Sequence, residues 1–276
     1  MNRLLNKRRR TATQVDPRVL KTPAEIEKMR AAGILARKVI ETIMVEACAG
    51  MTTGDIEDRA AEIIAAGGGT SPCLGYAPPG HPPYPAWTCT SVNEEIVHAI
   101  PGQKKLQNGD LFTMDCCVTL DGFVADTAVT IPIGVVTPEA QHLLKITEEA
   151  LTIGIKQAKP GNTTGDIGWA IQKHAEANGL SVVRELHGHG VGRAMHEGAI
   201  DVPNYAMPGT GILLVPGMTF AIEPMFNLGT KQIRTLKDGW TIVTADGKLS
   251  AHFEHTIAIT ASGCRILTGA QNSSAL

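Results

Sequence analysis

The pentapeptide Thr-Thr-Gly-Asp-Ile occurs at residues 52–56 of this chain and recurs letter for letter at residues 163–167. In each copy it stands between two stretches in which apolar residues recur at helical spacing. The helices after the two copies are predicted to end near residues 66 and 177, where glycines follow. A repeat by chance would not be expected between matching pairs of helices, so the pentapeptide indicates an internal duplication.

The helices before the two copies also begin alike. Residues 22–25 read Thr-Pro-Ala-Glu, with threonine at the N-cap, proline in the first turn and glutamate three residues after the cap. Residues 137–140 read Thr-Pro-Glu-Ala and open a second amphipathic run through residue 158, which Pro160 and Gly161 end. Two predicted helices therefore precede the strands in each half of the chain.

Each half carries two carboxylates at corresponding places. Asp115 stands six residues after a glycine, at the end of an apolar strand, and Glu223 does the same in the second half. Further along, residues 126–130 (Asp-Thr-Ala-Val-Thr) parallel residues 254–258 (Glu-His-Thr-Ile-Ala). The acidic residues of the two halves are therefore expected to converge where the two sheets meet.

These repeats predict an α+β domain, residues 21–270, with antiparallel sheets flanked by helices. Its two halves, about 22–134 and 137–262, are expected to be related by a pseudo-two-fold axis. Residues 1–20 and 271–276 are expected to be tails. The length is sufficient to bury a large core in a single domain.

The first ten residues carry five basic side chains and no acidic one. No apolar segment or cleavage site follows, so this segment is not a secretory signal. The charge pattern favours a disordered, solvated tail. Contact with ribosomal RNA near a nascent chain is the functional alternative, and an organellar transit role is a third.

The net charge, the lengths of the apolar runs and the cysteine spacing exclude several classes of protein. A formal net charge of −2 gives no reason to expect DNA as a partner. No run of eighteen apolar residues exists, so no membrane span is expected. None of the six cysteines forms a Cys-x-x-Cys pair, which favours free thiols in a reducing compartment, the cytoplasm.

The strongest chemical signal is a predicted β-hairpin around Asp121 and Gly122, a typical two-residue turn. This turn places Cys117 opposite Asp126, and alternation puts Asp115 and Asp126 on one face as diagonal neighbours. Acidic residues also cluster on solvated strand faces, but the rest of this strand reads as a buried sequence, and a buried carboxylate without a partner is costly. The hairpin therefore favours metal ligation.

His189 lies in the glycine-rich segment 187–192, where glycines on both sides allow close backbone approach. Together with the four carboxylates it would form the ligand set Asp115, Asp126, His189, Glu223 and Glu254. This set has no thiolate and is too acidic for one tetrahedral zinc, but it suits two divalent ions, Mn²⁺, Fe²⁺ or Co²⁺, with zinc as an alternative. Paired metals about 3.5–4 Å apart share a water and polarise a carbonyl, so hydrolysis is the expected chemistry.

Several motifs resemble those of the type I, bacterial-type methionine aminopeptidases. They are Cys-Leu-Gly-Tyr at 73–76, Asn-Glu at 93–94, His-Ala-Ile-Pro at 98–101, Gly-His-Gly-Val-Gly at 188–192, Phe-Ala-Ile-Glu-Pro at 220–224 and Phe-Glu-His-Thr at 253–256. The resemblance runs from about residue 22 to residue 268. It implies the pita-bread (creatinase/aminopeptidase) fold and removal of the initiator methionine from nascent proteins, with N-terminal methionyl peptides as substrates and a small second residue preferred.

The resemblance also implies a role for each ligand. Asp115 would bind one metal, His189 and Glu223 the other, and both ions would be bridged by Asp126 and Glu254. Glu223 would in addition move a proton from the bridging water.

Two further histidines take roles from the resemblance. His98 would contact the scissile amide nitrogen, and His196 would stabilise the developing oxyanion. A buried core histidine is the alternative for His98. The substrate pocket would be lined by these histidines and by sulfur and aromatic side chains suited to a thioether: Cys73, Tyr76, Tyr84, Cys89, Met195 and Trp240. An ordinary hydrophobic core would use the same residue types.

The chain departs from the family's pattern in four places. The proline-rich loop 77–83, which precedes Tyr84, is longer than usual, and Met195 stands where an aromatic residue is common. Cys117 and Ala221 replace threonines that are usual in the family. Because nearby negative charge raises the pKa of a thiol, we expect Cys117 to be neutral and to donate weakly to a ligand oxygen rather than bind metal.

Two rival functions share much of this pattern. A prolyl-type aminopeptidase or dipeptidase of the same fold would share the five ligands, but such relatives usually carry a further N-terminal domain. A non-catalytic peptide-binding homologue is the other rival, although such proteins typically lose metal ligands.

Overall fold

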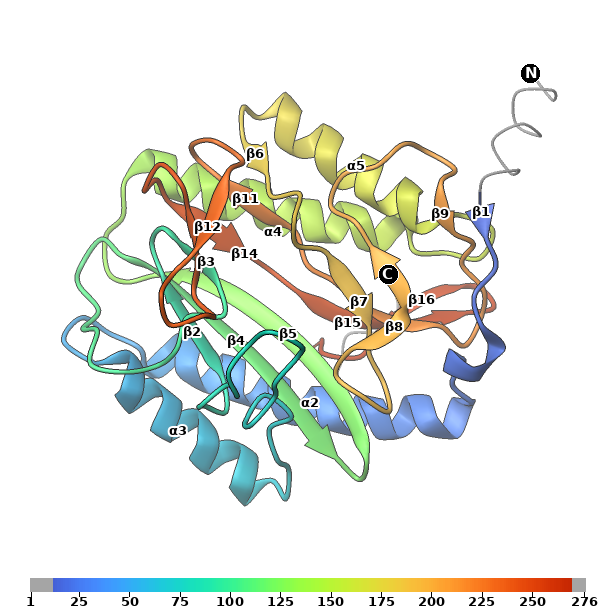
Figure 1. The fold of residues 1–276 in the computed structure, drawn as a ribbon, viewed down its shortest axis with the longest axis horizontal. Coiled ribbons are helices and arrows are strands. Elements are labelled where there is room, and N and C mark those ends of the chain that lie inside the picture. The colour runs from blue at the N-terminus through green and yellow to red at the C-terminus, as the bar shows by residue number, and fades with distance from the viewer. Residues whose placement is uncertain (1–11, 270–276) are drawn as a thin grey trace.

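The computed structural model describes residues 12–269, and it contains four α-helices within that range (Figure 1). They are α2 (Pro23–Glu46), α3 (Thr53–Ala66), α4 (Pro138–Gln157) and α5 (Thr164–Ala177). All four begin at a threonine N-cap, and capping boxes close the starts of α2, α3 and α5. The helices predicted from the repeats are confirmed.

The glycine of the repeated pentapeptide has the same task in both halves. The amide N–H of Gly54 donates to the carbonyl oxygen of Gly102 at 2.8 Å, and that of Gly165 donates to Thr210 at 3.1 Å. A Cβ atom would lie 3.0 Å from Gly102 O in the first copy and 2.6 Å from Thr210 O in the second. Glycine therefore lets a loop dock against the first turn of each helix.

The helix pairs lie on opposite sides of the molecule with the sheets between them (Figure 1). The first half contributes the sheet β2-β4-β5, made of Cys89–Val92, Leu111–Leu120 and Phe123–Pro132. Side chains of α2 and α3 form one hydrophobic core with this sheet, and α4 and α5 form another with the second-half strands. The mixture of helices and antiparallel sheets fits the predicted α+β class.

The second half has a five-stranded and a three-stranded sheet. The first is β16-β15-β10-β7-β8, made of Gly263–Ile266, His255–Thr260, Thr219–Ile222, Gly188–Gly190 and Glu197–Val202. The second is β14-β11-β6, made of Ser250–His252, Met225–Asn227 and Ser181–Val182. A further sheet, β12-β13-β3, joins Ile233–Thr235 and Ile242–Thr244 to Glu95–Val97 of the first half.

The ladders β10/β15 and β11/β14 have the same register, although two residues on each side interrupt the pairing between them. Ile222 lies opposite His255 on one side of the break, and Met225 lies opposite His252 on the other. Residues 223–224 therefore face residues 253–254 without a regular ladder, in part because a proline at 224 has no N–H to donate. The break opens where two of the predicted ligands lie.

The expected tail boundary at residue 20 differs from the structure. Within residues 12–20, β1 (Ala12–Thr13) pairs in parallel with β9 (Gly211–Ile212), and a 3₁₀ helix follows at Pro17–Val19. The apolar side chains of Val19 and Leu20 pack on the second-half core, which explains why the fold begins before the first long helix. The basic residues 1–11 and the expected C-terminal tail, residues 271–276, lie outside the described residues. Within the described range, no helix has the length and apolar character that crossing a membrane requires.

Candidate active site

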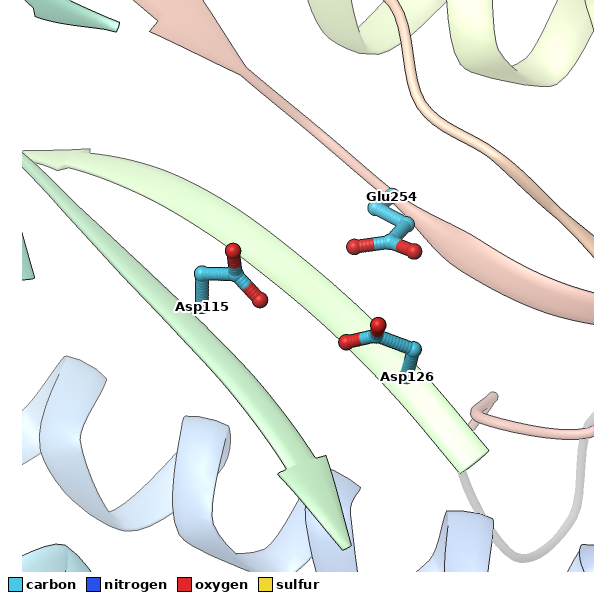
Figure 2. A group of neighbouring side chains, drawn as sticks. All are labelled: Asp115, Asp126 and Glu254. Carbon is cyan, nitrogen blue, oxygen red and sulfur yellow. The ribbon is translucent and has the colours of Figure 1, made fainter. Parts of the chain in front are cut away.

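The β4/β5 hairpin has the predicted register. Leu120 lies opposite Phe123 and Cys117 opposite Asp126, so the two-residue turn is central and both aspartates share a face. Figure 2 shows the carboxylates of Asp115, Asp126 and Glu254 turned toward a common space. One oxygen of each lies within 4.8 Å of the others. The structure therefore brings together carboxylates that are distant in sequence, as the repeat predicted.

Threonine hydroxyls join the two halves beside this space. The Thr256 hydroxyl donates to the carbonyl oxygen of Asp126 at 2.7 Å and accepts from its amide N–H at 2.9 Å. The Thr127 hydroxyl donates to Glu254 O, and the Thr130 hydroxyl bonds both the N–H and the C=O of His252 at 2.8 Å. These side chains replace a backbone ladder between β5 and the segment 252–256, a contact that we call the threonine seam.

The parallel with residues 126–130 suggests a strand position for Glu254, but it lies in the two-residue break between β14 and β15. Its N–H donates to Ala128 O of β5 at 2.9 Å, so its backbone bonds across the seam. The registers on either side of the break place it opposite Glu223. In the first half, by contrast, Asp115 lies opposite Ala128, and the two aspartates are diagonal neighbours.

His189 reaches the cluster from β7, whose neighbours approach closely. A Cβ atom on Gly188 would lie 2.3 Å from Ala221 O, and one on Gly190 would lie 2.7 Å from Glu197 O. The two glycines thus let β7 fit between β10 and β8, as their positions in the sequence suggested. The His189 Nε2 atom lies 3.7 Å from Glu223 Oε1.

Burial and like charge act on all four carboxyl groups. Burial raises the pKa of Glu223 and of Glu254 well above the usual range, and the nearby aspartates raise it further. Burial likewise raises the pKa of Asp115, with the charge of Asp126 as the next cause. For Asp126 burial raises the pKa to about 6, although hydrogen bonds from Cys117 and Thr127 oppose this effect.

The cluster fits cations. Buried oxygens of three acidic residues, Asp126 Oδ1, Glu223 Oε1 and Glu254 Oε1, find no hydrogen-bond partner among residues 12–269. Hydrogen-bond donors or cations are normally found at such atoms, because an unpaired buried charge is costly. Oxygen ligands with one imidazole are the donor set of hard or borderline divalent ions.

His98 and His196 border the same space. Burial lowers the pKa of His98 to about 4, which leaves a neutral ring near neutral pH, and its φ of 60° marks an unusual backbone conformation. The ring centroid of His196 lies 4.0 Å from that of His189, and the ring stacks on Tyr76 at 5.3 Å. Burial also lowers the pKa of His196. Both rings are positioned to contact a bound molecule.

Every site residue proposed from the sequence lines a single cavity of about 330 Å³. Its apolar end is formed by sulfur and aromatic groups: Cys73 Sγ lies 3.8 Å from Met195 Sδ, and the rings of Tyr84 and Trp240 meet edge to face at 5.2 Å. The proline-rich loop closes on this end, because Trp240 Nε1 donates to Pro82 O at 3.0 Å.

Sequence reasoning missed several lining residues. Leu186 and Ile242 add apolar surface, and His252 enters from β14. Alternation offered a signal for His252, because residue 252 shares a strand face with residue 254. Leu186 and Ile242 carried no such signal in the sequence, because their positions in the cavity wall depend on packing between distant segments.

The comparisons with known proteins agree with this geometry. Residues 27–261 match the metallopeptidase family M24. The chain is 44% identical over 251 residues to methionine aminopeptidase B of Synechocystis sp., covering 91% of each chain. Its structure resembles that of the methionine aminopeptidase of Rickettsia prowazekii with a TM-score of 0.87 and 38% identity, covering 93% of this chain and 100% of that one. The prolidase of Pyrococcus horikoshii shares the fold with a TM-score of 0.71 and 21% identity, but the match spans 92% of this chain and only 64% of that protein.

Proposed function

The chain belongs to the metallopeptidase family M24, and we propose on that premise that it removes the N-terminal methionine from newly made proteins. It is a metallo-aminopeptidase with the pita-bread fold. The similarity to methionine aminopeptidases over most of the chain favours this activity over a prolyl-type dipeptidase, since the prolidase likeness is one of fold alone.

One observation carries the substrate assignment. The cavity has an acidic end at Asp115, Asp126 and Glu254 and a sulfur and aromatic end at Met195 and Trp240. A methionine side chain fits the second end, because thioether sulfur packs favourably against aromatic rings. Its α-amino group and first peptide bond would then lie beside the carboxylates.

Divalent metal ions are implied by the family, and we propose that two bind each chain, with iron, manganese or cobalt as candidates and zinc as an alternative. Their ligands would be Asp115, Asp126, His189, Glu223 and Glu254. When bound, such ions supply Lewis-acid chemistry that polarises a carbonyl and lowers the pKa of water.

The side chains themselves supply position and protons. Glu223 would accept a proton from the attacking water at a carboxylate oxygen and later release it to the departing amine. Neutral His98 would contact the scissile amide nitrogen, and an N–H of His196 would donate to the carbonyl oxygen as negative charge develops there. The apolar wall at Trp240 would exclude water from the methionine side chain.

A small second residue is expected in the substrate, because that side chain must fit near the metal ligands. Nascent chains in the cytoplasm would be the natural substrates. The basic segment 1–11 provides positive charge suited to ribosomal RNA, and we propose ribosome association through it.

Methionine release tests this function. The purified protein would be given Met-Ala-Ser and the matching Pro- and Leu-initiated peptides, with and without Mn²⁺, Fe²⁺ or Co²⁺. We expect metal-dependent release of methionine only. Preferential cleavage of the Pro- or Leu-initiated peptides, or failure to release methionine with any of these ions, would contradict the proposal.

A further inference from the structure

His252 is a buried imidazole for which the proposed reaction has no use. Its side chain is 2% exposed and lines the active-site cavity. Neither ring nitrogen has a hydrogen-bond partner within the described part of the chain. A buried polar group of this kind normally has a partner, because leaving it unpaired is costly.

The ring lies between the two glutamates of the broken ladder. His252 Nε2 is 4.0 Å from Glu223 Oε2 and 4.0 Å from Glu254 Oε2. The other oxygen of each glutamate, Oε1, is buried without a partner among residues 12–269. On Glu223 this Oε1 atom faces His189, another proposed ligand, at 3.7 Å. The Oε2 atom of each glutamate therefore faces His252, and the Oε1 atom accepts no hydrogen bond from the described residues.

The backbone of His252 is fixed independently of its ring. The Thr130 hydroxyl accepts from its N–H and donates to its C=O, both at 2.8 Å, and the hydroxyl of Thr113 lies 2.8 Å from that of Thr130. His252 also pairs with Met225 in β14 and β11. The ring is thus held at the break by the same seam that holds Glu254.

We propose that His252 is a positioning residue for the metal centre, whose ring N–H is shared by the Oε2 atoms of Glu223 and Glu254 and so holds their Oε1 atoms toward the ions. An imidazole carries at least one N–H in each protonation state. An approach of about 1 Å would give normal hydrogen-bond distances. Partners that orient a ligand in this way typically contribute about 10–100-fold to metal affinity or activity.

The proposal rests on the proposed function only in assuming that these carboxylates bind divalent ions. Metal affinity therefore tests it separately from peptide cleavage. If the wild-type protein binds Mn²⁺ but releases no methionine, the proposed function fails while the role of His252 can still be measured.

The test compares variants by calorimetric titration of the metal-free protein with Mn²⁺. His252→Leu removes the donor and retains an apolar side chain, whereas His252→Gln retains a long N–H donor. We expect His252→Leu to raise the Kd for Mn²⁺ by about 10–100-fold and to lower kcat more than it raises KM, and His252→Gln to restore most of the affinity. His255→Gln is the matched control, since His255 bonds Thr268 at 2.8 Å and does not line the cavity.

Thermal unfolding of the metal-free variants separates positioning from folding, and His252→Asn replaces His252→Leu if the latter does not fold. Its amide is too short to reach both glutamates, so it should lose affinity in the same way. Wild-type affinity in His252→Leu, or equal losses in His252→Leu and His252→Gln, would overturn the proposal. So would loss of a nitrogen ligand in the visible absorption of the Co²⁺ form of either variant, because His252 would then bind the metal itself.

Discussion

The threonine seam should contribute strongly to both stability and metal binding, and Thr256→Val tests this directly. Valine matches threonine in shape but removes both hydrogen bonds to Asp126. Thr256 is 0% exposed, so water cannot replace them. One buried N–H and one buried C=O lose a partner, and each costs about 1–3 kcal/mol. The expected loss of unfolding free energy is therefore about 2–6 kcal/mol.

Thr147→Val is the matched control for this prediction. Thr147 is also 0% exposed, and its hydroxyl donates to Leu143 O at 2.7 Å within α4. The carbonyl oxygen of Leu143 lies inside the helix and retains its backbone hydrogen bond in the variant. Removing this hydroxyl leaves no orphaned group, so the expected loss is about 0.5–1.5 kcal/mol.

Urea unfolding of the metal-free proteins measures both losses, and Mn²⁺ titration measures the consequence for the site. In Thr256→Val the Asp126 backbone is no longer fixed, so the affinity for Mn²⁺ should fall as well. Thr256→Ser, which retains the hydroxyl, should recover most of both quantities. If Thr256→Val is no less stable than Thr147→Val and binds Mn²⁺ as the wild type does, the seam does not position Asp126.

Three further outcomes are expected. Glu254→Gln should weaken metal binding and abolish most turnover, because the variant loses a carboxylate that we propose bridges the two ions. Wild-type metal content together with wild-type activity would contradict this. The kcat/KM for Met-Ala peptides should exceed that for Met-Leu peptides, and equal values would argue against a restricted site for the second residue. Gly188→Ala should destabilise the protein by about 1–3 kcal/mol and displace His189, because the new Cβ would lie 2.3 Å from Ala221 O. Unchanged stability and Mn²⁺ affinity in that variant would show that β7 can shift freely.

The features that sequence predicted correctly are local ones. A threonine cap with a glutamate three positions later determines where α2 begins, and the predicted start at residues 22–25 agrees with the structure. The turn at Asp121-Gly122 determines the hairpin register because a two-residue loop leaves no freedom to slip. That register then places Asp115 and Asp126 without knowledge of the rest of the fold.

The features that sequence missed depend on contacts between distant segments. The pairing of β1 with β9 joins residues about two hundred positions apart and has no local signal. At the break, the N–H of Glu254 donates to Ala128 O of the other half instead of continuing a strand, and this long-range bond has no local signal. Alternation could have placed His252 on the face of Glu254, but its position between Glu223 and Glu254 depends on the broken ladder and the seam, which join distant segments.

The internal duplication explains why the site lies at the seam and why its two sides differ. In the first half an unbroken hairpin presents Asp115 and Asp126 as diagonal neighbours. In the second half the break places Glu223 opposite Glu254, and it brings His252 within 4.0 Å of both. At the break the N–H of Glu254 donates to Ala128 O of the first half, so the second half completes the cluster that the first half begins against that half's own sheet.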